Sequence, residues 1–181
     1  MSSMVLSGDT SGTVTVTVPA VAGTNTATLP AATGTVMVSG NMPAFSAYAS
    51  ASQTGLTSST YVKAAFNTKV FDTNNNYDNT TNYRFTPTVA GYYQVNASYY
   101  LNGTGLNGQA NIYKTGSFYQ GTQYTNTTST TCIISISTII YLNGSTDYIE
   151  GYVYGSTTAG TWTITNSQTY TYFNAVLVRG A

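Results

Sequence analysis

Apolar and polar residues alternate over several short stretches of this chain, and the clearest stretch runs from Tyr83 to Gly103. In its second half every other position is apolar or aromatic, namely Tyr93, Val95, Ala97, Tyr99 and Leu101. A period of two places one set of side chains against a core and the other set outward. The pattern predicts the central, half-buried strand of a β-sandwich, ending in a hairpin turn at Asn102–Gly103.

The same alternation continues towards the C-terminus. Residues 131–142 place one apolar set on a single face, made of Cys132, Ile134, Ile136, Ile140 and Leu142. Asn143–Gly144 predicts a second hairpin turn, and residues 146–154 return as a strand. Further strands are expected within 44–49, 61–71, 109–115, 162–164 and 170–178, whereas 72–82 and the polar stretch up to Thr130 are expected to be loops. No amphipathic helix is indicated, so the fold class is all-β.

The first 42 residues differ from the rest because they contain no aromatic side chain. Short alternating stretches predict strands at 13–18, 27–29 and 35–38, each too small to close a core alone. A flexible linker is one interpretation. We favour a β-rich attachment segment, residues 1–42, that buries its Val and Leu side chains against copies of itself or another protein. The boundary falls at Asn41–Pro43, and residues 43–181 form the main domain.

Charge is scarce: 6% of residues are charged, with five basic and five acidic side chains. That inventory cannot build a basic patch, so nucleic acid is not an expected partner. A hydrophobic fraction of 41% argues against disorder. The N-terminus lacks the pattern of a signal peptide and no apolar run is long enough to span a membrane, so we expect synthesis in the cytoplasm and no membrane insertion.

The residue inventory argues against catalysis and cofactors. The chain has no histidine, which excludes Ser-His-Asp and Cys-His sites. Its one cysteine, Cys132, lies in the inward set of a predicted strand, where a thiol behaves as a small hydrophobe. Asp147 and Glu150 point to opposite faces and cannot act as a pair. Hydrolysis of a glycan would require a subunit interface that brings carboxylates together.

Asp72 and Asp78 flank an Asn-rich stretch that spaces oxygen atoms as a calcium loop does. A helix-flanked calcium loop, however, needs glycine at its sixth position and an acid at its twelfth, where this chain has Tyr77 and Tyr83. The alternative is a structural loop whose side chains form turns. We expect no metal, with Asp72 and Asp78 as the only candidate ligands.

Several short motifs recur along residues 43–181: Ala44–Ala47, Phe71–Asp72 with Tyr77–Asp78, Arg84–Phe85, Gly91–Tyr93, Tyr141–Gly144 with Asp147–Tyr148, and Tyr172–Leu177. They occur in the order found in the globular head of complement component one q, and residues 43–181 resemble that family. The resemblance implies a tumour-necrosis-factor jelly roll of ten strands that packs as a tight homotrimer. The family's disulfide-forming cysteines have no counterpart here, which fits a chain that is not secreted.

The N-terminal segment carries a second resemblance. Gly12–Val16, Ala27–Ala31 and Thr33–Val36 are similar to a lead-in found in fibre proteins of tailed bacteriophages. Together, the two resemblances imply a virion fibre or decoration protein with a distal trimeric head.

Tyrosine is abundant, with 17 residues in the chain. Several tyrosines lie opposite the apolar set of their strand, and a ring with a hydroxyl suits interfaces and sugar-binding surfaces alike. We predict a trimer interface that contains Tyr92, Tyr100, Tyr148, Tyr152 and Tyr154. The aromatic residues expected to stack on a glycan from loops are Tyr119, Tyr124 and Trp162.

These observations predict a structural and adhesive virion protein. Its N-terminal segment binds other virion proteins, and its head contacts a glycan or protein on the host surface. Two alternatives stay open: a capsid or tail decoration protein without a receptor, and a glycan-degrading enzyme.

Overall fold

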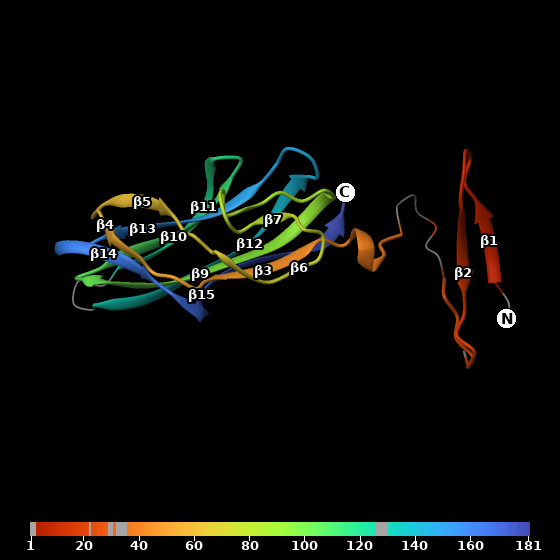
Figure 1. Ribbon diagram of the computed structural model, residues 1–181, viewed down its shortest axis with the longest axis horizontal. Coiled ribbons are helices and arrows are strands. Elements are labelled where there is room, and N and C mark those ends of the chain that lie inside the picture. The colour runs from red at the N-terminus through yellow and green to blue at the C-terminus, as the bar shows by residue number, and fades with distance from the viewer. Residues whose placement is uncertain (1–2, 22, 29–30, 32–35, 126–129) are drawn as a thin grey trace. The chain divides into compact units, whose positions relative to one another are not determined.

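The computed structural model describes residues 3–21, 23–28, 31, 36–125 and 130–181, which form two compact units, residues 1–34 and 35–181. In the first unit, β1 (Ser3–Ser7) pairs with β2 (Thr13–Thr17) as an antiparallel hairpin (Figure 1). The register sets Met4 opposite Val16 and Leu6 opposite Val14, so one face of the hairpin is apolar and exposed.

The N-terminal strand predictions are confirmed only in part. The alternating stretch at 13–18 contains β2, but its partner β1 was not predicted. Ala27, Thr28 and residues 36–38 form no strand, whereas Leu29 and Thr35 lie outside the described residues. A short 3-10 helix, Ser39–Asn41, precedes the second unit. No helix within the described ranges is long and apolar enough to cross a membrane.

The second unit is an all-β sandwich of two stacked sheets (Figure 1). The seven-strand sheet consists of β3 (Ala44–Ala49), β4 (Gln53–Leu56), β6 (Thr68–Asp72), β9 (Ala90–Thr104), β12 (Thr131–Asn143), β14 (Ala159–Thr165) and β15 (Ser167–Gly180). The six-strand sheet consists of β5 (Thr60–Lys63), β7 (Tyr77–Asp78), β8 (Arg84–Phe85), β10 (Asn107–Lys114), β11 (Ser117–Thr125) and β13 (Ile149–Ser156).

Strand β9 is central, as the alternation predicts. It pairs with β12 along one edge and with β15 and β14 along the other. The five residues of its predicted apolar face are each 0% exposed. The predicted apolar face of β12 is buried as well. Between the sheets, the ring of Phe45 stacks on Tyr77 at 4.5 Å and on Phe85 at 4.6 Å, so β3, β7 and β8 share one aromatic cluster.

Both predicted Asn-Gly hairpins are wrong. Asn102 and Gly103 lie inside β9, and glycine is needed there because a Cβ on Gly103 would approach Thr157 and Trp162 to within 3.0 Å. The chain turns two residues later, at Gly105, where φ is +61°. Gly144 does form a turn with φ of +70°, but it joins β12 to β13, which belong to different sheets.

Strand β11 was not predicted, because residues 117–125 were expected to be a loop. It forms a hairpin with β10 through Thr115 and Gly116, both with positive φ, as a tight hairpin turn of the I′ type requires. Its side chains are almost all exposed, so neither face of this edge strand carries an apolar pattern. Likewise, the expected loop at 72–82 contains the two-residue strand β7.

Two buried tyrosines on β9 give a test of the core. Tyr93 donates a hydrogen bond to the Val89 carbonyl at 2.7 Å, whereas the Tyr99 hydroxyl is buried without a partner among the described residues. We expect Tyr93→Phe to lower the free energy of unfolding by about 1 kcal/mol and Tyr99→Phe to leave it unchanged or raise it. Thermal unfolding of both variants at equal protein concentration checks this, and equal losses would contradict it.

Candidate functional site: the two outer faces of the sandwich

The outer face of the seven-strand sheet, here called the seven-strand face, exposes large apolar side chains. Six of them, each 41–54% exposed, come from β9, β12 and β15: Tyr92, Ile133, Ile139, Tyr141, Tyr170 and Val176. They form two groups. In one, the ring of Tyr92 lies 5.5 Å from the ring of Tyr141, and in the other the ring of Tyr170 lies 6.1 Å from the ring of Tyr100. An apolar surface of this kind marks a contact site for another protein surface.

Neutral polar side chains lie between these two apolar groups and are bonded to one another. Gln94 donates to Ser137 at 2.8 Å, Ser137 donates to Asn96 at 2.8 Å, and Asn96 donates to Asn174 at 2.9 Å. Ser135 on β12 donates to Ser98 on β9 at 2.9 Å. This hydrogen-bonded row crosses β12, β9 and β15 without a charged group, so the centre of the face can be desolvated at less cost than one built from ions.

The outer face of the six-strand sheet, here called the six-strand face, also carries aromatic side chains. Strand register places Tyr61, Tyr154 and Gln109 in one row across β5, β13 and β10, with Tyr152 and Asn111 in the next. Tyr61 packs on Tyr154 with centroids 4.9 Å apart, and Tyr113 stacks on Tyr152 at 4.1 Å. The aromatic rings on this face therefore hold one another in place.

Charged groups on the six-strand face are already paired. Lys63 forms an ion pair with the buried carboxylate of Glu150 and lies 5.8 Å from the centroid of Tyr152. The Arg84 guanidinium lies 4.5 Å from the centroid of Tyr148. Lys114 pairs with Asp147 at 2.9 Å near the β10–β11 turn. Each cation packs against a ring or a carboxylate of its own chain.

A groove of about 300 Å³ crosses the six-strand face at its β11 edge. Its lining residues are Tyr61, Gln109, Asn111, Phe118, Gly121, Thr122 and Gln123. The Asn111 carboxamide packs directly on Gly121 in this lining: a Cβ there would lie 2.3 Å from Asn111 Oδ1 and 3.1 Å from the Phe118 ring, so a larger residue would displace them. None of these residues was predicted to bind a ligand, because they come together from strands that are distant in sequence.

The structure divides the tyrosines of the predicted trimer interface between two faces. Tyr92 and Tyr100 lie on the seven-strand face, whereas Tyr148, Tyr152 and Tyr154 lie on the six-strand face. The outer faces of a sandwich point in opposite directions, so no single patch of one subunit contains both sets. The five tyrosines therefore do not share one surface, and their assignment to a subunit interface stays a prediction.

The aromatic residues expected to stack on a glycan are not neighbours in one loop. Tyr119 and Tyr124 belong to β11, where Tyr119 donates to the Ile139 carbonyl at 3.4 Å and Tyr124 packs partly against the core. Trp162 lies on β14, is 1% exposed and donates from Nε1 to the Thr57 carbonyl at 2.8 Å. Trp162 is therefore a core residue that packs on Gly155. The strand expected at 162–164 is confirmed within β14, whereas the expected stacking of Trp162 on a glycan from a loop is wrong because the ring is buried.

The Asn-rich loop uses both of its carboxylates locally. Asp72 accepts hydrogen bonds from the backbone N–H groups of Asn76 and Tyr77 and pairs with Lys69 at 2.9 Å. Asp78 accepts from the backbone N–H groups of Thr80, Thr81 and Asn82 at 2.9–3.1 Å. These contacts are those of side chains that stabilise turns, and the described residues contain no group of three or more His, Cys, Asp or Glu side chains that could hold a metal ion.

The sulfur atom of Cys132 is poorly suited to covalent chemistry. The side chain is buried on the inner face of β12, and this burial raises the pKa of its thiol to about 11. The reactive thiolate is thus a fraction of about 10⁻³ at pH 8. Asp147 and Glu150, the other candidates for acid-base chemistry, are each paired with a lysine.

The turn built on Asp78 predicts a specific dependence on acid. Hydrogen bonds from the backbone of Thr81 and Thr80 hold the pKa of this carboxyl well below its usual range. A depressed pKa stabilises the fold above the unfolded value of about 3.9 and loses this effect as the pH falls below it. We expect Asp78→Asn to lower the melting temperature at pH 7 and to flatten its decline between about pH 5 and 3.

Circular dichroism melts across this pH range measure the effect. Asp9→Asn, in the other unit, is the matched control and should keep the profile of the unchanged protein. Parallel pH profiles for Asp78→Asn and the unchanged protein would show that the Asp78 turn does not set the acid response.

No protein-family model matches this sequence, and no curated protein matches it. Solved structures do match the fold. The globular domain of zebrafish complement 1qA protein aligns with a TM-score of 0.51 and 17% identity, over 77% of this chain and 99% of that one. Murine APRIL aligns with a TM-score of 0.55 and 10% identity, over 76% and 99% of the two chains.

Eiger TNF from S. frugiperda gives a similar result, with a TM-score of 0.52 and 12% identity over 77% of this chain and 93% of that one. None of these three proteins is named as an enzyme. Identities this low establish fold alone. The protein is thus an all-β chain whose β-sandwich has the jelly-roll fold of the complement one q and tumour-necrosis-factor proteins, preceded by a small two-strand sheet.

Proposed function

We propose that the protein is a homotrimeric fibre or knob of a bacteriophage virion that attaches the particle to the surface of its host. The observation that carries the trimer is the seven-strand face. It exposes six large apolar side chains around a centre of neutral, mutually bonded polar groups. Jelly rolls of this fold commonly form trimers, and such a face supplies the apolar area that a stable interface requires.

Threefold geometry assigns the two faces different roles. In a ring of three subunits, the directions from one subunit to its two neighbours differ by about 60°. The seven-strand face and the six-strand face point in opposite directions, so only one of them can turn towards the threefold axis. The apolar seven-strand face is the one buried, and the six-strand face with its groove stays open to solvent.

The N-terminal hairpin supplies the attachment to the particle. Its apolar face carries Met4, Leu6, Val14 and Val16, which are each at least half exposed within the structure. A two-strand hairpin is at best marginally stable alone, so this face requires a partner surface. Another virion protein, or the same segment of neighbouring subunits, provides it.

The assignment to a phage rests on the lead-in sequence of the first unit together with the fold of the second. The protein is made in the host cytoplasm and works on the assembled virion. Its mechanism is multivalency: three weak sites per trimer, repeated over a particle, bind a surface with an avidity beyond that of one site. Catalysis has no part in it, because the acidic groups named above are engaged in ion pairs and turns.

The trimer predicts the mass of the protein in solution. Light scattering should give three times the chain mass of 19.1 kDa. Ile139→Asp places a charge among the apolar side chains of the proposed interface and is expected to give monomers. Phe118→Asp, which alters an equally exposed apolar residue on the six-strand face, is the matched control and should remain trimeric. A monomeric native protein, or a monomeric Phe118→Asp variant, would contradict this interface.

Adhesion predicts that binding to cells depends on the trimer. Fluorescently labelled protein, added to a panel of bacterial strains, should bind the surface of at least one strain. The monomeric Ile139→Asp variant should bind that strain about 100-fold more weakly, because avidity is lost while the individual sites are intact. Binding of the trimer to none of the strains would favour a decoration protein without a receptor, and release of sugar from those cells would favour an enzyme.

A further inference from the structure

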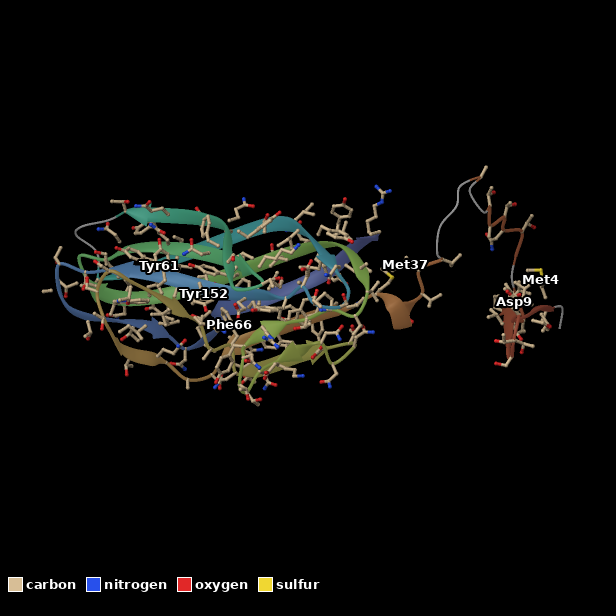
Figure 2. The ribbon with its side chains drawn as sticks, turned by 90° about the horizontal axis from the view of Figure 1, so that it is seen from above. Met4, Asp9, Met37, Tyr61, Phe66 and Tyr152 are labelled. Atoms are coloured by element: carbon tan, nitrogen blue, oxygen red, sulfur yellow. The ribbon has the colours of Figure 1, made fainter. Side chains whose placement is uncertain are left out.

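We propose that the groove on the six-strand face binds a single sugar ring of a neutral glycan. This inference rests on the adhesive function proposed above and specifies its ligand and its site. The groove lies between Tyr61 on β5 and Phe118 on β11, with β13 and β10 between those strands. Figure 2 labels Tyr61 of β5 and Tyr152 of β13, two strands that pair directly.

The lining of the groove matches the chemistry of a sugar. None of its seven residues is charged, and three of them, Gln109, Asn111 and Gln123, carry carboxamides. A carboxamide both donates and accepts hydrogen bonds, as does each hydroxyl of a sugar. Lys63, which strand register places in the same row as Asn111, is already paired with Glu150. An anionic ligand would therefore find no free counter-charge in the groove.

Two exposed aromatic rings complete the groove. Phe118 is 60% exposed and Tyr61 is 52% exposed, values far above those of core aromatics. The negative face of such a ring attracts the C–H groups that a pyranose presents on one side. A volume of about 300 Å³ lies at the lower end of the range for small-molecule sites, which suits one ring better than a long chain.

The groove is preformed, which lowers the entropic cost of binding. The Tyr61 ring packs on Tyr154, and its hydroxyl donates to Gln109 Oε1 at 3.1 Å. The Phe118 ring meets Tyr113 edge-on, with centroids 6.1 Å apart at 90°. Asn111 is buried, and its carboxamide lies over Gly121. Both aromatic rings and two of the three carboxamides of the lining thus have a neighbour that fixes their orientation.

Saturation-transfer NMR with the full chain tests the proposal. The probes are the methyl glycosides of glucose, galactose, mannose and N-acetylglucosamine, with methyl glucuronide as an anionic comparator. We expect saturation of at least one neutral glycoside and none of the glucuronide. Gly121→Val displaces the Asn111 carboxamide and crowds the Phe118 ring, and Phe118→Ala removes that ring. Each should therefore weaken binding by about tenfold or more, equivalent to about 1.4 kcal/mol.

Ser117→Ala is the matched control, because Ser117 precedes Phe118 on β11 and is exposed outside the groove lining. It should bind the glycoside as the unchanged protein does. Failure of all four neutral glycosides, binding of the glucuronide alone, or undiminished binding by Gly121→Val overturns the proposal. Loss in Ser117→Ala as well also overturns it, because β11 as a whole and not the groove would then be required.

Light scattering of the same samples separates this inference from the function on which it rests. A trimer that binds none of the glycosides refutes the sugar site and leaves the threefold assembly standing. A monomer that binds a glycoside, with loss in Gly121→Val, confirms the groove and refutes the assembly. Unchanged melting curves for Gly121→Val and Phe118→Ala show that a loss of binding is not a loss of fold.

Discussion

Strand β9 is paired with other strands along both of its edges, and the rest of this structure depends on that constraint. β9 is bonded to β12 on one side and to β15 and β14 on the other, so its inner side chains occupy the middle of the core. Because side chains alternate along a strand, its outer side chains then occupy the middle of the seven-strand face. A single strand therefore fixes both the core and the surface that we assign to the trimer.

The scarcity of charge shapes the surface as much as the core. With 6% charged residues, the protein cannot cover its outer faces with ions. It uses amides, hydroxyls and tyrosines, which bond to one another across strands, as in the row from Ser137 through Asn96 to Asn174. Such groups lose less hydration free energy than ions do when they leave water. The same composition therefore suits both an interface between subunits and a groove for a neutral ligand.

The sequence predicts those parts of the fold in which one strand face is buried. β9 and β12 were found because burial forces a period of two on their residues. β11 was missed because an edge strand with both faces exposed carries no such period. Gly103 was predicted to lie in a turn, but it is glycine because Trp162 and Thr157 pack closely against it. The sequence alone does not distinguish these two reasons for a glycine. Near Trp162 the signal was present: Trp162 and Ile164 alternate with threonines, a period of two that places both on the buried face of β14.

The candidate site was harder to predict for a related reason. Alternation shows that Tyr100 and Tyr154 point outward, but not that they point outward from different sheets, because that depends on the order in which distant strands pair. The groove is a stronger case: Tyr61, Asn111 and Phe118 meet only through the register of β5, β13, β10 and β11. A sandwich with one face buried in a threefold assembly must present its opposite face outward in every subunit. The same geometry that closes the trimer thus leaves three equivalent grooves facing the solvent, which is the arrangement that multivalent attachment requires.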